Sequence, residues 1–165
     1  IVGVTPEARS VGDALGGNTP LDIITITERD IEESLSMLCE TGRAKLDYIS
    51  LGCPHYTIEQ MMIAANFLKG KKVHSNTVLH IWTAAPIKET ADRCGYTEII
   101  ERAGGIVLTS SCPLTSEKKP DGAVTMAFDS GKQAHYIKPG SGAKVYFGSM
   151  EDCLKSAISG YWEGR

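Results

Sequence analysis

Residues 46–60 read LDYISLGCPHYTIEQ. The run Leu46–Leu51 is typical of a buried strand, and Thr57-Ile58-Glu59-Gln60 matches a capping box, which marks the start of a helix. Between them, Gly52-Cys53-Pro54-His55 predicts a stiff, non-helical turn, because proline fixes its own φ and disfavours the helical conformation in the residue before it. This stretch therefore predicts a strand, a turn that presents Cys53, and a helix.

The same alternation continues along most of the chain. Further strands are expected over 78–82, 106–108, 123–128 and 144–147, and further helices over 28–41, 86–94, 97–103 and from Ser149 onward. Strands that alternate with helices are typical of a parallel sheet. We therefore expect a single α/β domain over 1–165, with a mostly parallel sheet and helices on both of its faces.

The first part of the chain shows less periodicity. It begins with Ile1 rather than Met, and Ile1-Val2-Gly3-Val4 has the composition of a buried strand, so we expect a piece of a larger enzyme. The Gly- and Pro-rich stretch up to Pro20 is expected to form a surface loop. Thr27 is expected to cap a helix, whose buried face is predicted at Ile31, Leu35 and Leu38.

The composition excludes several classes of protein. The chain has 165 residues, of which 42% are hydrophobic, and this is enough for a core without metal or disulfide support. The net charge is −3 and no cluster of Lys and Arg stands out, which disfavours nucleic acids and anionic membranes as partners. Five widely spaced cysteines favour thiol or metal chemistry in a reducing compartment, and we expect the cytoplasm.

Cys53 and Cys112 both precede a proline and follow an expected strand. In open α/β sheets the carboxyl ends of the strands form the edge where ligands bind, so the two thiols are candidates for a shared metal or cluster site. The alternative is that both are small buried apolar residues. No C-x-x-C pattern occurs, which argues against a thioredoxin-like motif and most structural zinc sites. His55 is a candidate ligand, acid/base group or substrate contact, or it hydrogen-bonds its own turn.

Residues 128–136 read FDSGKQAHY and predict a strand, a small polar turn and a helix. Backbone N–H groups at such a helix start can hold a carboxylate or phosphate, and Lys132 adds a positive charge. Ser130 is a candidate binding hydroxyl or proton carrier. The alternative is an ordinary helix cap formed by Asp129 or Ser130, and the residues alone leave this choice open.

Several of these segments, taken together, resemble a known family. In chain order they are residues 2–8, Gly52-Cys53-Pro54-His55, Cys112, residues 129–136 and residues 145–149. In this order they resemble the large-subunit region of the aconitase X family. The resemblance implies a fold like the iron–sulfur domain of aconitase, in a hydro-lyase that removes water from a small hydroxy acid such as cis-3-hydroxy-L-proline or mevalonate 5-phosphate.

The resemblance also implies a cofactor and partners. Cys53 and Cys112 are expected to hold an iron–sulfur cluster or iron, with a further cysteine supplied from outside this chain. The cluster is therefore expected to be absent or incomplete in this segment, which alone should be inactive. The rest of the catalytic subunit and a small swivel domain or subunit are the expected partners.

The resemblance extends to the loop after residue 128. It implies that Ser130 and Lys132 belong to the substrate-binding loop, and we expect His55 and Asp129 to bind substrate as well. Ser130 is our candidate base, because nearby cations can stabilise a serine alkoxide, although it would also serve by hydrogen-bonding a carboxylate. Asp129 departs from the Asn more usual in the family, which leaves the substrate's identity open. The alternatives are a metal-free binding or assembly domain on the same scaffold, or a site for another metal such as zinc.

Overall fold

The computed structural model of the protein describes residues 1–116 and 120–164. Contacts divide the chain into two units, Ile1–Glu33 and Ser34–Arg165, and each is treated by itself. Across the described residues, no helix has both the length and the apolar composition that a membrane span requires.

The first unit contains a short helix, α1 (Val11–Leu15), and the beginning of α2 (Glu28–Leu38). The predicted strand over residues 1–4 is wrong. The backbone N–H groups of Val4 and Thr5 both donate to the carbonyl of Ile1, so these residues form a turn. A strand requires a neighbouring strand to satisfy its backbone groups, whereas this turn satisfies them locally.

Helix α2 begins where the sequence predicts. The hydroxyl of Thr27 accepts a hydrogen bond from the backbone N–H of Asp30, as an N-cap should. The predicted buried face is wrong, because Ile31 and Leu35 are exposed and none of the helix's described residues is buried. Helical spacing of apolar residues shows which face can be buried, but burial also needs an element to pack against.

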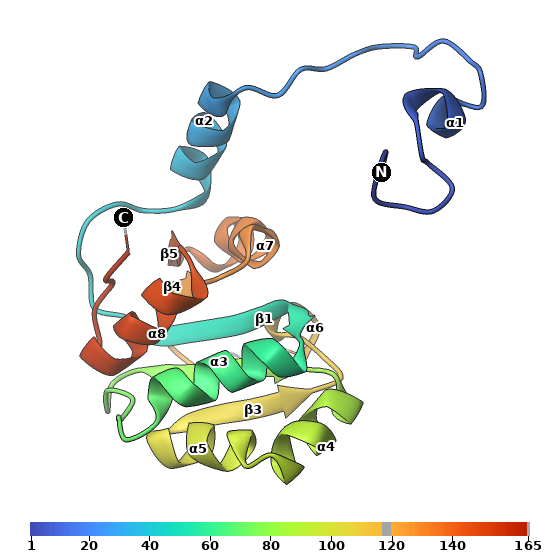
Figure 1. The fold of residues 1–165 in the computed structure, drawn as a ribbon. Coiled ribbons are helices and arrows are strands. Elements are labelled where there is room, and N and C mark those ends of the chain that lie inside the picture. The colour runs from blue at the N-terminus through green and yellow to red at the C-terminus, as the bar shows by residue number, and fades with distance from the viewer. Residues whose placement is uncertain (117–119, 165) are drawn as a thin grey trace. The chain divides into compact units, whose positions relative to one another are not determined.

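The second unit is built on a five-stranded parallel sheet (Figure 1). The strand order is β3-β2-β1-β4-β5, so β1 is central. The bounds are β1 Tyr48–Tyr56, β2 Val78–Thr83, β3 Gly105–Thr109, β4 Thr125–Phe128 and β5 Lys144–Phe147. The predicted α/β class and parallel sheet are confirmed.

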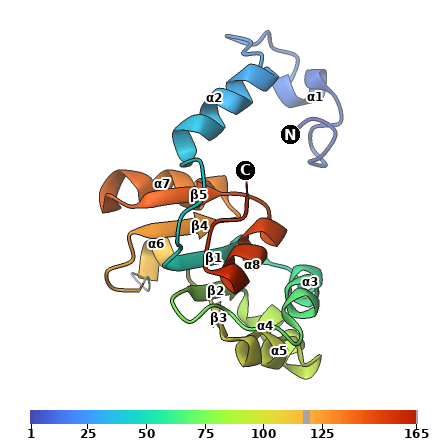
Figure 2. The same cartoon turned by 90° about the vertical axis from the view of Figure 1, so that its left-hand side faces the viewer.

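Helices cover both faces of this sheet, as predicted. One face packs against α3 (Ile58–Leu68), α5 (Tyr96–Ala103) and α8 (Met150–Ser159), and α4 (Ala85–Arg93) contacts α3 and α5. The other face packs against α7 (Gly131–Ser141), with the short helix α6 (Pro113–Ser116) beside it. Figure 2 shows α6 and α7 on the left of the sheet and α3 and α8 on its right.

Successive side chains of β1 point to opposite faces of the sheet, and this explains why the core has two layers. Ile49 and Leu51 point into the core beneath α3 and α8, whereas Tyr48 points into the core beneath α7. His80 of β2 lies on the side of Tyr48, and its Nδ1 is 3.1 Å from the Tyr48 hydroxyl. Burial raises the pKa of Tyr48 to about 12. This pair therefore has a packing role in the interior.

The predicted capping box is present at the start of α3. The Thr57 hydroxyl accepts from the backbone N–H of Gln60, and the Gln60 side chain accepts from the backbone N–H of Thr57. Ser149 and Asp152 form the same arrangement at the start of α8. These local hydrogen bonds set where the helices begin, independently of the sheet.

Gly52 lies where β1 comes close to its neighbour β2. Its φ is +96°, and a Cβ at this position would lie 2.2 Å from the carbonyl oxygen of Trp82. Residues that carry a side chain rarely adopt a φ in this range, and no Cβ atom fits 2.2 Å from a carbonyl oxygen. Glycine is therefore required here by both conformation and space.

We expect Gly52→Ala to destabilise the chain by about 3 kcal/mol or more, because it combines backbone strain with a clash against a strand. Gly70→Ala is the matched control: its φ is +74° but nothing lies within 4 Å of the new Cβ. This control should cost only about 1 kcal/mol. Urea unfolding of the two variants checks the difference, and equal costs would contradict the steric argument.

Candidate active site

The site lies at the carboxyl edge of the sheet, where the order of strands reverses. From the central β1, the chain proceeds outward through β2 and β3 on one side and through β4 and β5 on the other. Ligands of open α/β sheets bind in the crevice outside such a switch point. The segments that carry the predicted site residues all lie at the ends of β1, β3 and β4.

Cys53 and His55 lie in an irregularity of β1. Leu51 pairs with Ile81 and Tyr56 pairs with Thr83, so β1 has extra residues between two nearby partners in β2. The hydroxyl of Thr83 donates to the Tyr56 carbonyl at 2.6 Å and closes this bulge. Cys53 and His55 are both partly exposed. The predicted turn is therefore a bulge within a longer strand, and it displaces both residues from the ladder.

One hydrogen bond joins the two cysteine segments. The Nε2 atom of His55 lies 2.8 Å from the carbonyl oxygen of Ser111, the residue before Cys112. Because a carbonyl only accepts, Nε2 carries the proton. The structure thus brings the Cys53 and Cys112 segments together, and gives His55 a contact beyond its own turn.

Cys112 is partly buried just before α6. Burial acts to raise the pKa of its thiol, but hydrogen bonds from the Thr115 side chain and from the backbone of Leu114 and Thr115, with the charge of Lys132, lower the pKa overall. A thiol of lowered pKa is a better metal ligand and nucleophile. The Cys112 thiol is therefore deprotonated more readily than an ordinary cysteine.

Asp129 lies at the end of β4 and makes two hydrogen bonds to β1. Its Oδ2 accepts from the Tyr56 hydroxyl at 2.5 Å, and its Oδ1 accepts from the backbone N–H of Gly52 at 3.2 Å. Burial raises the pKa of this carboxyl group, although the hydrogen bonds from Tyr56 and Gly52 act against that rise. Both carboxylate oxygens are therefore engaged within the protein.

Ser130 is the N-cap of α7. Its hydroxyl is buried and accepts the backbone N–H of Gln133 at 3.3 Å. The sequence left a choice between an anion-binding loop and a cap, and the geometry shows the cap. Lys132, two residues further on, is exposed and acts electrostatically on Cys112.

The sequence analysis did not single out Tyr56 and Thr115, both of which contact candidate residues. No local pattern indicated the contact of Tyr56, because its partner Asp129 is far away in the sequence. The sequence could have indicated Thr115. It lies three positions after Cys112 at a helix start, where a polar side chain can hydrogen-bond back to the residue that precedes the helix.

A groove of about 640 Å³ adjoins the site beside Asp129. It lies between the segment after α2, the end of β5 and the start of α8. Its described lining includes the carboxylates Glu40, Asp129 and Asp152, and it contains no Lys, Arg or His. An anionic ligand is therefore disfavoured in this groove.

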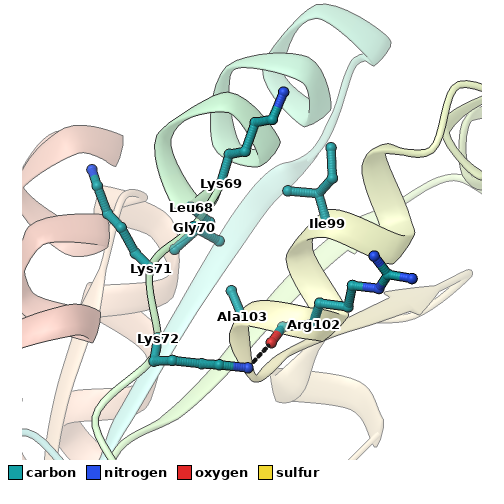
Figure 3. A pocket seen from close by; sticks show the side chains of 8 residues that line it. All are labelled: Leu68, Lys69, Gly70, Lys71, Lys72, Ile99, Arg102 and Ala103. Carbon is teal, nitrogen blue, oxygen red and sulfur yellow. Dashed lines mark hydrogen bonds between the residues drawn. The ribbon is translucent and has the colours of Figure 1, made fainter.

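A second hollow lies between α3 and α5 and is lined by Lys69, Lys71, Lys72 and Arg102 (Figure 3). The charged ends of Lys69, Lys71 and Arg102 point away from one another. The Nζ of Lys72 donates to the carbonyl of Arg102, and the Arg102 guanidinium pairs with Glu98. These cations do not converge on one point, so this hollow is not an anion site.

Within residues 1–116 and 120–164, no three His, Cys, Asp or Glu side chains are grouped so that they could hold a metal ion. The hydrogen bond from His55 brings the Cys53 and Cys112 segments together, and the pKa of the Cys112 thiol is lowered. Two cysteines are fewer than an iron–sulfur cluster needs, so the described residues do not form a metal site by themselves.

We expect Thr115→Val to raise the pKa of the Cys112 thiol, because the variant loses the hydroxyl 3.5 Å from the sulfur. Alkylation of Cys112 with iodoacetamide, followed by mass spectrometry across a pH series, should show its midpoint at higher pH. Thr90→Val is the matched control, since the Thr90 hydroxyl donates to the Pro86 carbonyl. A midpoint that stays at the wild-type pH would contradict the assigned cause.

Comparisons with known proteins agree with this geometry. A sequence profile described as the aconitase X third domain matches residues 46–159. The chain is 26% identical, over 97% of its length, to cis-3-hydroxy-L-proline dehydratase of Pseudomonas aeruginosa, of which it covers 28%. It is 36% identical, over 84% of its length, to the phosphomevalonate dehydratase large subunit of Methanocaldococcus jannaschii, of which it covers 34%.

A solved structure has the same fold. The crystal structure of Thermococcus kodakaraensis aconitase X in its holo-form superposes with a TM-score of 0.74 at 30% identity, and the match covers 94% of this chain and 38% of that one. The chain thus spans about a third of the length of these relatives. Because the profile matches well over half of the chain, this protein belongs to the aconitase X family, and residues 46–159 are its third domain.

Proposed function

We propose that the full-length protein is a hydro-lyase that removes water from a small hydroxy acid, with part of its active site at the carboxyl edge of β1, β3 and β4. The observation that carries this proposal is the His55–Ser111 hydrogen bond, which holds the two cysteine segments side by side. Support comes from the relatives, which are named dehydratases of cis-3-hydroxy-L-proline and phosphomevalonate.

An iron–sulfur cluster or iron is the proposed cofactor. Cys53 and Cys112 would hold it, together with at least one ligand from outside this chain. When bound, an iron with an open coordination position supplies a Lewis acid for the leaving hydroxyl group. His55 donates its Nε2 proton to Ser111 and so keeps the Cys53 bulge against Cys112.

Lys132 and Ser130 are proposed to act on the substrate. Lys132 is exposed and close enough to affect Cys112, so its ammonium group can bind the carboxylate of a hydroxy acid near the thiols. The Ser130 oxygen lies at the positive end of α7 and accepts the Gln133 N–H, and both features stabilise a negative charge on that oxygen. Ser130 is therefore proposed as the base that removes a proton from carbon.

We propose the cellular location from the chain's cysteines and the partner from its relatives. All five cysteines are free, which supports the cytoplasm as the location. Some relatives are named large subunits, so a smaller subunit or domain is the proposed partner that completes the site.

We expect Cys53→Ser and Cys112→Ser, in the full-length protein reconstituted anaerobically with iron and sulfide, each to lose about tenfold or more of the bound iron and of the dehydration rate. Cys94→Ser is the control, because Cys94 is an exposed thiol at the end of α4. Elemental analysis and a dehydration assay with cis-3-hydroxy-L-proline and mevalonate 5-phosphate provide the measurements. Wild-type protein that holds no metal and dehydrates neither compound would instead support a metal-free binding or assembly domain, whereas bound zinc would support a site for another metal.

We expect Ser130→Asn to abolish most of the dehydration rate of the full-length protein while leaving its melting temperature within a few degrees of the wild type. Asparagine caps helices about as well as serine but has no hydroxyl to act as a base. Ser130→Ala should lose both the rate and about 1 kcal/mol of stability. Full activity in Ser130→Asn would show that Ser130 is a cap alone.

A further inference from the structure

We propose that Asp129 and Tyr56 are positioning residues, whose hydrogen bonds hold the Cys53 bulge at a fixed place relative to the Ser130 loop. This inference rests on the proposed function only for its catalytic consequence. Its structural content concerns the described residues themselves, namely a carboxylate at the end of β4 with two donors from β1.

The two donors lie on either side of Cys53. Gly52 is the residue before it, and Tyr56 pairs with β2 where the ladder resumes. One carboxylate therefore ties both ends of the segment that carries Cys53 and His55. A bulge restrained at both ends has less freedom to move its central residues.

The same carboxylate belongs to the residue before Ser130. Ser130 begins α7, and Lys132 lies in its first turn. Any shift of Asp129 would move this helix start, whereas any shift of the bulge would break the bonds to Gly52 and Tyr56. The two groups of candidate residues are thus coupled through one side chain across the switch point between β1 and β4.

Burial makes this coupling strong. Tyr56 is 2% exposed, and burial together with the charge of Asp129 raises the pKa of its hydroxyl well above the usual range, so it remains a donor. Without the carboxylate, this buried hydroxyl would lose its 2.5 Å acceptor and could not reach water instead. Both oxygens of Asp129 accept a hydrogen bond from β1, so the carboxylate has a role in holding the bulge whether or not it also contacts a substrate.

The test compares three variants of the metal-free full-length protein. Asp129→Asn keeps an acceptor for Gly52 and an amide that can donate to the Tyr56 oxygen, whereas Asp129→Ala removes both bonds. Tyr56→Phe removes the hydroxyl alone. The readout is the iodoacetamide labelling rate of Cys53, followed by mass spectrometry, with the exposed Cys94 as internal reference.

We expect labelling of Cys53 to rise about tenfold in Asp129→Ala and about threefold in Tyr56→Phe, and to stay near the wild-type rate in Asp129→Asn. Cys94 should react equally in all of them. If Asp129→Ala does not fold, the Tyr56→Phe and Asp129→Asn pair decides the matter. Wild-type labelling of Cys53 in every folded variant that lacks these bonds would overturn the proposal.

Activity of the reconstituted protein separates this inference from the proposed function. Positioning predicts that Tyr56→Phe lowers kcat and the iron content with little change in KM, and that both stay near the wild-type values in Asp129→Asn. A substrate contact through the charge of Asp129 would instead raise KM in Asp129→Asn and overturn the positioning role. If the wild type dehydrates nothing, the proposed function fails, and the labelling rates still decide whether Asp129 and Tyr56 hold the bulge.

Discussion

A partly buried carboxylate links β4 to β1 at the point where the strand order reverses. Asp129, at the end of β4, accepts hydrogen bonds from Gly52 and Tyr56 of β1. Burial of a carboxylate is unfavourable unless its oxygens are hydrogen-bonded. The hydrogen bonds from Gly52 and Tyr56 therefore stabilise the charged form of Asp129. In our proposal this group adds to the β1–β4 ladder in fixing the bulge of β1 relative to the start of α7.

The second constraint at this edge is space. Gly52 approaches the backbone of Trp82 so closely that no side chain fits, which allows its N–H to face Asp129. The bulge that follows then turns His55 toward the carbonyl of Ser111 at the end of β3. Hydrogen bonds of the His55, Tyr56 and Asp129 side chains therefore join the segments from β1, β3 and β4 that carry or precede the cysteines.

Local patterns in the sequence predicted much of the fold. The capping box at Thr57, the helix start at Ser149 and the alternation of apolar runs with helices predicted the element order and the parallel sheet, because these signals depend on neighbouring residues. The strand predicted at residues 1–4 and the buried face predicted for α2 were wrong for the opposite reason. Pairing and burial depend on a partner element, which a local pattern does not reveal.

The sequence by itself determined the candidate chemistry: two thiols before prolines, a histidine beside one of them, and a Ser-Gly-Lys loop after a strand. It also determined that these groups follow strands, and hence that they lie at one edge of a parallel sheet. Only the tertiary structure decided that His55 contacts the Cys112 segment, that Ser130 caps α7, and that Asp129 bonds to β1. The bonds of His55 and Asp129 join residues more than fifty positions apart, and their geometry follows from strand order and bulge shape, which no local pattern encodes.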